Sequence, residues 1–152
     1  MCCLKVAKIE MKKIAQKALD DLEFGVVLEQ AALRCATALG KAQMMTTIPS
    51  SDVGEVKKAL LRTNEYAISL SEEKPIPNHG FEDVSEEVSL LDVENSKIEV
   101  EGFRKLLLLV DTANTLITFF KKNKDRYPTL YEATYGQVPI KEIPNEINRV
   151  VD

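Results

Sequence analysis

The sequence contains no tryptophan and few aromatic, glycine or proline residues. Aromatic residues make up 6% of the 152 positions, and glycine and proline number six each. A β-sandwich of this length would need more turn-forming and aromatic residues, so the composition favours helices. No two glycines are closer than 14 positions. This spacing excludes the clustered glycines of Walker and dinucleotide-binding loops, in which the backbone closely approaches a phosphate.

Cysteines and long apolar runs are also scarce. The three cysteines are Cys2, Cys3 and Cys35, with no C-x-x-C pair. Neither a zinc site nor a disulfide framework is expected from them, and reduced thiols suit the cytoplasm. The longest apolar run, Leu106–Val110, has five residues. Because a bilayer-spanning helix needs roughly 20, no membrane association is expected.

Acidic residues outnumber basic ones, and the net charge is −4. A free-standing nucleic-acid-binding module is usually basic, so this balance argues against one. The excess negative charge is concentrated in residues 72–101, where ten acidic residues accompany two lysines. Prolines and Gly80 predict a loop in the first part of this segment. One short helix is predicted there by apolar residues at three- and four-residue intervals, namely Phe81, Val84, Val88 and Leu91.

Apolar residues recur every three or four positions through most of the remaining sequence. This spacing is typical of amphipathic helices, so we predict an all-α fold, an irregular helical bundle. One long helix near residues 100–124 dominates the pattern. The other expected helices span residues 8–21, 24–40, 52–71 and 143–151, with a short piece at 129–134.

The helix expected at residues 52–71 has clear boundary signals. Pro49 prevents the preceding helix from continuing. Asp52 and Glu55 have the spacing of a capping box, in which side chains satisfy free backbone amides. We expect this helix to bury one apolar stripe, made of Val53, Val56, Leu60, Thr63, Ala67 and Leu70.

Residue types that carry catalysis are few and scattered. The only histidine, His79, lies in a proline-flanked loop that is typical of an exposed side chain. The adjacent pairs Glu72-Glu73 and Glu86-Glu87 point about 100° apart on a helix, so they do not converge on one substrate. We predict no catalytic, cofactor-binding or metal-binding residue. Four basic residues near the end of the long helix are candidates for weak phosphate contacts, although a helix C-terminus also favours cations: Lys121, Lys122, Lys124 and Arg126.

Several short motifs, taken in order, resemble the type-two branch of the MutS family. The first three are Leu22-Glu23-Phe24, Ala38–Lys41 and Ile48–Asp52. The opening Leu-Glu-Phe narrows the resemblance to the branch that begins directly with the helical core. The resemblance covers residues 18–152. Its later parts are Leu60–Glu65, Ile76–Val84, Ile98–Arg104, Tyr127–Leu130 and Glu146–Asp152.

This resemblance implies a segment of a larger, non-membrane protein. Type-two MutS proteins have a helical core, an inserted clamp, a dimerising ATPase domain and often a small nuclease domain. They are associated with branched DNA, recombination suppression and stalled ribosomes. The resemblance implies that residues 18–152 form one helical domain, the first half of the core and lever, with residues 1–17 as an N-terminal extension. Its role would be a scaffold between the ATPase and clamp parts, by analogy with the family.

The resemblance also implies what this segment lacks and what it binds. We expect it not to be an enzyme, because ATP, magnesium, branched DNA and ribosomes would be bound through domains outside it. Its partner would be the remainder of its own chain. As a fragment it would be a monomer, and at full length a homodimer. Five positions would be structural: Glu23, Phe24, Gly40, Pro49 and Asp52.

Gly40 allows a physical expectation beside the family one. It follows an apolar helical stripe and precedes a polar stretch. Glycine at such a place either ends a helix in the left-handed conformation or lets two backbones approach closely.

Two other functions remain open. The chain is a stand-alone helical interaction module if the acidic segment 72–101 docks a basic partner. A small all-α enzyme of the chorismate-mutase kind would need convergent basic groups in a helix-lined pocket. The arginines do not support that reading because they are scattered along the sequence, at Arg34, Arg62, Arg104, Arg126 and Arg149.

Overall fold

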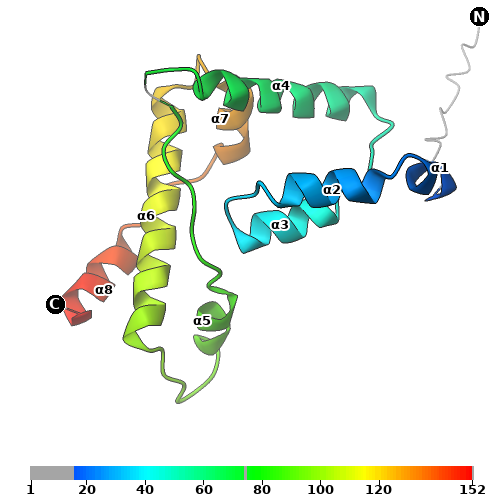
Figure 1. Ribbon diagram of the computed structural model, residues 1–152. Coiled ribbons are helices and arrows are strands. Elements are labelled where there is room, and N and C mark those ends of the chain that lie inside the picture. The colour runs from blue at the N-terminus through cyan, green and yellow to red at the C-terminus, as the bar shows by residue number, and fades with distance from the viewer. Residues whose placement is uncertain (1–15, 74, 152) are drawn as a thin grey trace, which may run out of the picture.

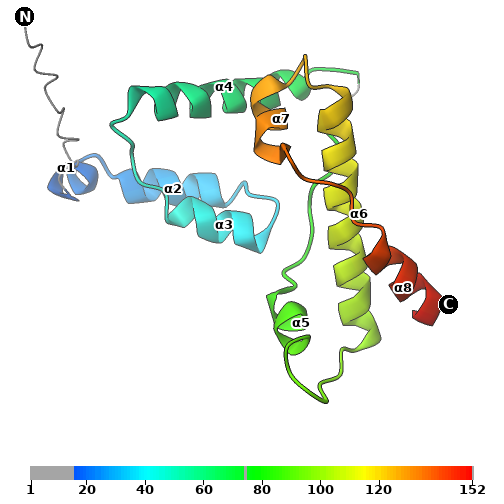
Figure 2. The same cartoon turned by 180° about the vertical axis from the view of Figure 1, so that it is seen from behind.

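The computed structural model describes residues 16–73 and 75–151 (Figures 1 and 2). These residues form eight helices and no strand, which confirms the predicted all-α fold. None of these helices combines the length and apolar content needed to cross a bilayer. Cys2, Cys3 and the first half of the helix expected at 8–21 lie outside the described residues. The helices are α1 (Gln16–Asp21), α2 (Phe24–Ala32), α3 (Ala38–Met45), α4 (Val53–Ser69), α5 (Ser85–Leu90), α6 (Val100–Lys122), α7 (Pro128–Thr134) and α8 (Glu142–Val151).

The segment expected as one helix over residues 24–40 is a helical hairpin. α2 ends at Ala32, and α3 begins at Ala38. Thr37 stabilises the start of α3, because its side-chain oxygen accepts a hydrogen bond from the Gly40 N–H at 3.0 Å. Such a cap satisfies an amide that lacks a partner in the first helical turn. The prediction of one helix is wrong because the apolar spacing continues in step across the turn.

Gly40 does not have the conformation we expected. It is the third residue of α3, and Gly136 is the only glycine with positive φ among the described residues. A Cβ at Gly40 would meet only side-chain atoms, with Thr37 Oγ1 at 3.0 Å and Cys35 Cβ at 3.8 Å. Both expected roles are therefore wrong. The physical reason is that a helix begins at this position rather than ends there.

α4 begins where the sequence predicts. The Asp52 carboxylate accepts a hydrogen bond from the Glu55 N–H at 2.8 Å, which confirms the expected cap. The Ser50 hydroxyl donates to the Glu55 carboxylate at 2.8 Å and accepts from the Asp52 N–H at 3.1 Å. Ser50 thereby connects both acidic residues of the cap. The helix ends at Ser69, close to the expected end near residue 71.

α6 is the centre of the C-terminal half. Its 23 residues make it about 35 Å long, and its bounds agree with the expected 100–124 within two residues. α5, α7 and α8 each contact it. Phe120 near its end is buried together with Tyr127, which follows it. Both rings lie within 6.4 Å of each other and of Phe119, the range of favourable aromatic packing.

The helices form two contact groups. α2 contacts α1 and α3, whereas α4 contacts α7, which contacts α6. Among the described residues, no helix of the first group contacts a helix of the second. Figure 1 shows the α2–α3 hairpin running roughly parallel to α4 but apart from it, and α4 lying crosswise near one end of α6. Residues 46–52, including Pro49, connect the two groups. One domain over residues 18–152 stays a prediction.

The apolar stripe of α4, which we expected to be buried, is exposed. Val53, Leu60 and Leu70 are 66%, 63% and 68% exposed. α4 contacts α7 through other side chains, including Lys58 and Glu65. The prediction of burial is wrong because an amphipathic pattern identifies an apolar face without saying what covers it.

Candidate functional site: the junction of α4, α6 and α7

The ends of α4, α6 and α7 meet at one cluster of polar contacts, which we call the junction. Its members are Glu65, Glu72, Arg126, Tyr127 and Thr129. The hydrogen bonds within it connect residues 54 to 64 positions apart in the sequence. Local sequence does not determine how these helices are oriented relative to one another. Contacts between residues far apart in the sequence fix that orientation.

Glu65 of α4 caps the N-terminus of α7. Its two carboxylate oxygens accept hydrogen bonds from the Thr129 N–H at 3.0 and 3.1 Å, and one also accepts from the Leu130 N–H at 3.0 Å. Pro128, the first residue of α7, has no N–H to satisfy. A carboxylate is favourable here because the amides and the helix dipole both attract an anion. Glu65 therefore anchors α7 on α4.

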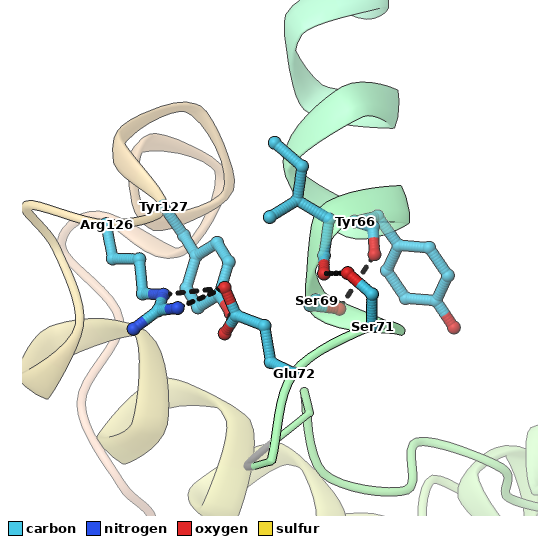
Figure 3. Close-up of polar contacts among 7 residues, drawn as sticks. Tyr66, Ser69, Ser71, Glu72, Arg126 and Tyr127 are labelled. Atoms are coloured by element: carbon cyan, nitrogen blue, oxygen red, sulfur yellow. Dashed lines mark hydrogen bonds and ion pairs between the residues drawn. The ribbon is translucent and has the colours of Figure 1, made fainter.

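Glu72 follows α4 and binds both residues that precede α7 (Figure 3). The Arg126 guanidinium donates to Glu72 Oε1 through Nε at 2.9 Å and also through Nη2. The Tyr127 hydroxyl donates to the other oxygen, Oε2, at 2.6 Å. Tyr127 is only 1% exposed, so its hydroxyl needs such a partner. Glu72 thus ties the end of α4 to the turn between α6 and α7.

These contacts shift the pKa values of two groups in opposite directions. The hydrogen bond from Tyr127, with the Arg126 charge and hydrogen bond, lowers the pKa of Glu72 below its ordinary value. Burial, together with the Glu72 carboxylate, raises the pKa of Tyr127. Both shifts stabilise the arrangement in which an ionised carboxylate accepts from a neutral phenol. The junction therefore keeps one protonation state at neutral pH.

A second ion pair lies at the edge of the α4–α7 contact. Lys58 Nζ lies 2.7 Å from Glu132 Oε1, and both side chains are about half exposed. The hydrogen bond and charge of Lys58 lower the pKa of Glu132. Exposed pairs of this kind contribute little stability, so the junction depends mainly on Glu65 and Glu72.

An asparagine holds the segment that precedes α8 against α6. Asn114 Nδ2 donates to the Ile140 carbonyl oxygen at 2.7 Å, and the Ile140 N–H donates to Asn114 Oδ1 at 2.8 Å. This pair satisfies both backbone groups of one residue, as a neighbouring strand would. It places α8 against α6, where Ile147 is buried.

The acidic segment 72–101 is partly neutralised by the chain itself. Lys105 Nζ lies 3.4 Å from Glu87 and 3.8 Å from Glu82, and the Glu87 charge is the main cause of a raised Lys105 pKa. The segment therefore offers less free negative charge than its composition indicates. Its use as a docking surface stays a prediction. Among the residues of this segment that the structure describes, five acidic side chains make ion pairs or hydrogen bonds with other described residues: Glu72, Glu82, Asp83, Glu87 and Glu101.

The four candidate phosphate contacts are all exposed but differ in their surroundings. Lys121 and Lys122 lie in the last turn of α6, and Lys124 lies in the turn that follows. Arg126 is engaged by Glu72. Among the described residues, the three lysines make no ion pair, so three of the four expected cations are available for phosphate. Phosphate binding by this group stays a prediction.

Three of the family positions lie around the α2–α3 hairpin. Glu23 precedes α2 in the left-handed conformation, with φ of 52°. Phe24 and Ile48 line the same groove of about 410 Å³ between α2 and the segment after α3, next to the half-buried Pro49. The structural role of these positions stays a prediction.

No catalytic arrangement is seen in the part of the chain that the structure describes. Residues 16–73 and 75–151 contain no group of three or more His, Cys, Asp or Glu side chains placed to hold a metal. His79 lies beside Tyr66, with Nε2 3.4 Å from its hydroxyl oxygen and Nδ1 3.1 Å from the Pro77 carbonyl oxygen. Two open grooves of about 640 and 650 Å³ adjoin Phe119. The absence of catalysis stays a prediction.

Sequence reasoning missed the three residues that hold the junction together, Glu65, Glu72 and Tyr127. One signal was present, because Tyr127-Pro128 predicts the end of one helix and permits the start of another. A new helix N-terminus needs a partner for its amides, and no capping residue directly precedes Pro128. The partner lies 64 positions away in the sequence, so local patterns do not reveal it.

Comparison with known proteins gives one consistent result. The chain is similar to proteins named "Endonuclease MutS2" from Pelotomaculum thermopropionicum, Alkaliphilus metalliredigens and Lactobacillus johnsonii. Each is 26% identical to it, over 145, 140 and 110 residues, which are 90%, 87% and 72% of this chain. These matches support a MutS2-like relationship, as the sequence motifs predicted.

The relationship covers only part of those proteins. The chain spans 14% to 17% of the length of the three relatives. No family model matches the chain. No solved structure matches it either.

Proposed function

We propose that this chain is a non-catalytic helical core segment of a MutS-like protein. It acts as a scaffold between an ATPase part and a DNA-clamp part of such a protein. The observation that carries this proposal is the match to MutS2 proteins over up to 90% of the chain. The order of the motifs along residues 18–152 supports it.

The junction suits a scaffold role. Glu65 and Glu72 connect α4 to α7 and to the end of α6 through charged hydrogen bonds, which are stronger than neutral ones. α6 is about 35 Å long, so a small rotation at the junction displaces its far end by a larger distance. Helices connected in this way move together, which allows motion at one end to reach the other.

The chemistry implied by the relatives' name is proposed to lie outside this chain. Endonuclease activity and ATP hydrolysis both depend on clustered ligands for phosphate or metal. The glycines are scattered, and the described residues have no candidate metal cluster. Activity is therefore tested in a full-length relative, and binding is tested with this chain alone.

A domain exchange tests the scaffold role. Residues 18–152 replace the matching region of the MutS2 protein from P. thermopropionicum, and ATP hydrolysis is measured with and without branched DNA. We expect the double variant Glu65→Ala, Glu72→Gln to reduce the stimulation by DNA about threefold or more, with nucleotide affinity nearly unchanged. Unchanged stimulation would contradict the proposal. The matched control is Glu73→Gln, which neutralises an exposed neighbour of Glu72.

The isolated chain gives a second, independent test. Calorimetric titration with ATP and magnesium should show no binding at millimolar concentrations. Binding with a dissociation constant well below a millimolar would overturn the non-catalytic part of the proposal, whatever the exchange experiment shows.

A further inference from the structure

Residues 46–52 join the two contact groups of the fold, α1–α3 and α4–α8 (Figure 2). In the part of the chain that the structure describes, no helix pair, hydrogen bond or ion pair connects one group to the other. Each group has contacts of its own. α2 contacts α1 and α3, whereas Glu65 and Glu72 fix α4 to α7 and to the turn before it. The orientation of one group relative to the other therefore depends on the connecting residues.

The first connecting residues remain attached to α3. The Thr46 N–H donates to the Gln43 carbonyl oxygen at 3.2 Å, and the Thr47 N–H donates to the Met44 carbonyl oxygen at 3.1 Å. The Thr46 hydroxyl donates to the same Gln43 oxygen at 2.9 Å. These bonds satisfy carbonyl groups of the last helical turn, so Thr46 and Thr47 move together with α3.

The last connecting residues are attached to α4. Ser50 Oγ accepts a hydrogen bond from the Asp52 N–H at 3.1 Å and donates to the Glu55 carboxylate at 2.8 Å. Asp52 itself caps the helix by accepting from the Glu55 N–H. Local side-chain bonds of this kind restrict the backbone of a turn, so Ser50 moves together with the first turn of α4.

Between these two attachments lie Ile48 and Pro49, whose backbones make no hydrogen bond with the described residues. The ring of Pro49 holds its φ at about −65° and keeps Ile48 in an extended conformation. The least restrained backbone bonds are therefore the two that flank the peptide group between Pro49 and Ser50. Rotation about them turns α4 relative to α3 and breaks none of the hydrogen bonds named above.

The turn between α2 and α3 differs from this connection. α2 and α3 contact each other along the hairpin, and the Thr37 side chain caps α3 through the Gly40 N–H. Within the turn, the Cys35 N–H donates to the Ala32 carbonyl oxygen at 3.1 Å. Bending there would separate packed helices, so the hairpin stays one unit.

We propose that Pro49 and Ser50 form a swivel, about which α1–α3 turns as one body relative to α4–α8. Protein hinges are a few residues at the ends of elements that absorb changes in φ and ψ, and these two residues occupy such a place. The swivel leaves α1–α3 outside the set of helices that the junction holds together. The inference concerns this chain by itself and does not depend on the proposed scaffold function.

Distances between two spin labels, measured by double electron–electron resonance on the full chain, test the swivel. Labels are attached at exposed lysines of a chain in which three residues are replaced by serine: Cys2, Cys3 and Cys35. Lys41→Cys in α3 with Lys121→Cys in α6 is the spanning pair. Lys57→Cys in α4 with Lys121→Cys is the reference pair, which lies within the second group. We expect the distance distribution of the spanning pair to be about twofold broader or more. Equal widths would overturn the proposal.

Substitutions at Ser50 test the location of the motion. Ser50→Pro fixes φ at position 50 and restricts ψ of Pro49, so it restrains both bonds of the swivel. Ser50→Ala is the matched control, because it removes the same hydroxyl and leaves both bonds free. We expect the spanning pair to have a distribution about twofold narrower in Ser50→Pro than in Ser50→Ala, with the reference pair alike in both. Circular dichroism checks that both variants stay helical. A spanning pair equally broad in the two variants would refute the swivel.

Discussion

The carboxylate of Glu65 lies 3.0 and 3.1 Å from the backbone nitrogen of Thr129 and caps a helix that begins 63 positions later in the sequence. Substitution Glu65→Ala removes this cap and leaves two amides of α7 without a partner. We expect the free energy of unfolding to fall by about 1–2 kcal/mol, the usual effect of losing an N-cap. Urea denaturation followed by circular dichroism measures this change.

A neighbouring substitution provides the control for the Glu65 cap. Asn64→Ala changes the preceding, exposed residue of α4 and should alter the unfolding free energy by less than about 0.5 kcal/mol. Equal effects of Glu65→Ala and Asn64→Ala would show that the cap adds no specific stability.

The contacts of Glu72 lead us to expect that the folded chain loses stability as the pH becomes acidic. Its pKa in the folded chain is lowered, chiefly by the Tyr127 hydrogen bond. The stabilisation is therefore fully present above the ordinary value of 4.5 and is lost as the pH falls through the lower folded value. We expect the urea midpoint to fall more steeply with acidification in the wild-type chain than in Glu72→Gln. Comparison of both midpoints between pH 7 and pH 3 measures the difference.

Other acidic residues also protonate in this range, so the Glu72 prediction needs a matched control. Glu73→Gln removes the same charge from an exposed side chain beside Glu72. Its acid dependence should follow that of the wild type. If Glu72→Gln does so as well, the junction carboxylate does not govern acid stability.

The sequence predicted the positions of individual helices better than it predicted which helices contact one another. Asp52, Glu55 and Pro49 set the start of α4, because capping and proline geometry are local. The bounds of α6 agree closely with the prediction, because a long amphipathic pattern stays recognisable even where single residues do not fit it. The break between α2 and α3 was missed, since Thr37 caps α3 without interrupting the apolar spacing.

The junction was not predictable from local sequence, for a physical reason. Glu65 and Glu72 lie on a helix and a turn whose patterns identify them only as polar positions. Their roles depend on α7, whose amides come within hydrogen-bonding distance only after folding. The exposed apolar stripe of α4 shows the same limit, because periodicity identified this face correctly but not what surrounds it.

Gly102 allows α5 to approach α6 closely. The residue is buried, and a Cβ there would lie 2.8 Å from Ile98 Cγ2 and 2.9 Å from Glu87 Cγ. Both atoms are near their own backbones, so they cannot move aside easily. We expect Gly102→Ala to lower the unfolding free energy by about 1–3 kcal/mol through overpacking, although alanine favours helices. Thermal and urea unfolding measure the loss.

Gly25→Ala separates crowding from helix propensity. Gly25 also lies in a helix, and a Cβ there meets no atom within 4 Å. Alanine should therefore leave stability unchanged or raise it by up to about 1 kcal/mol. Stabilisation by both substitutions would show that α5 does not press against Gly102 in solution.

The basic residues at the end of α6 lead to a prediction for DNA binding. Arg126 is occupied by Glu72, which leaves Lys121, Lys122 and Lys124 for phosphate contacts. Three contacts release about three counterions, so the logarithm of the association constant should fall with the logarithm of salt concentration with a slope of about −2.7. The net charge of −4 further opposes binding to DNA. We therefore expect a dissociation constant above about 100 μM at physiological salt, measured by fluorescence anisotropy with a branched duplex.

Lys121→Glu with Lys122→Glu should abolish the residual binding at low salt, whereas Lys17→Glu in α1 should reduce it only slightly. Micromolar binding at physiological salt that survives the Lys121 and Lys122 substitutions would place the DNA-binding surface elsewhere on the chain.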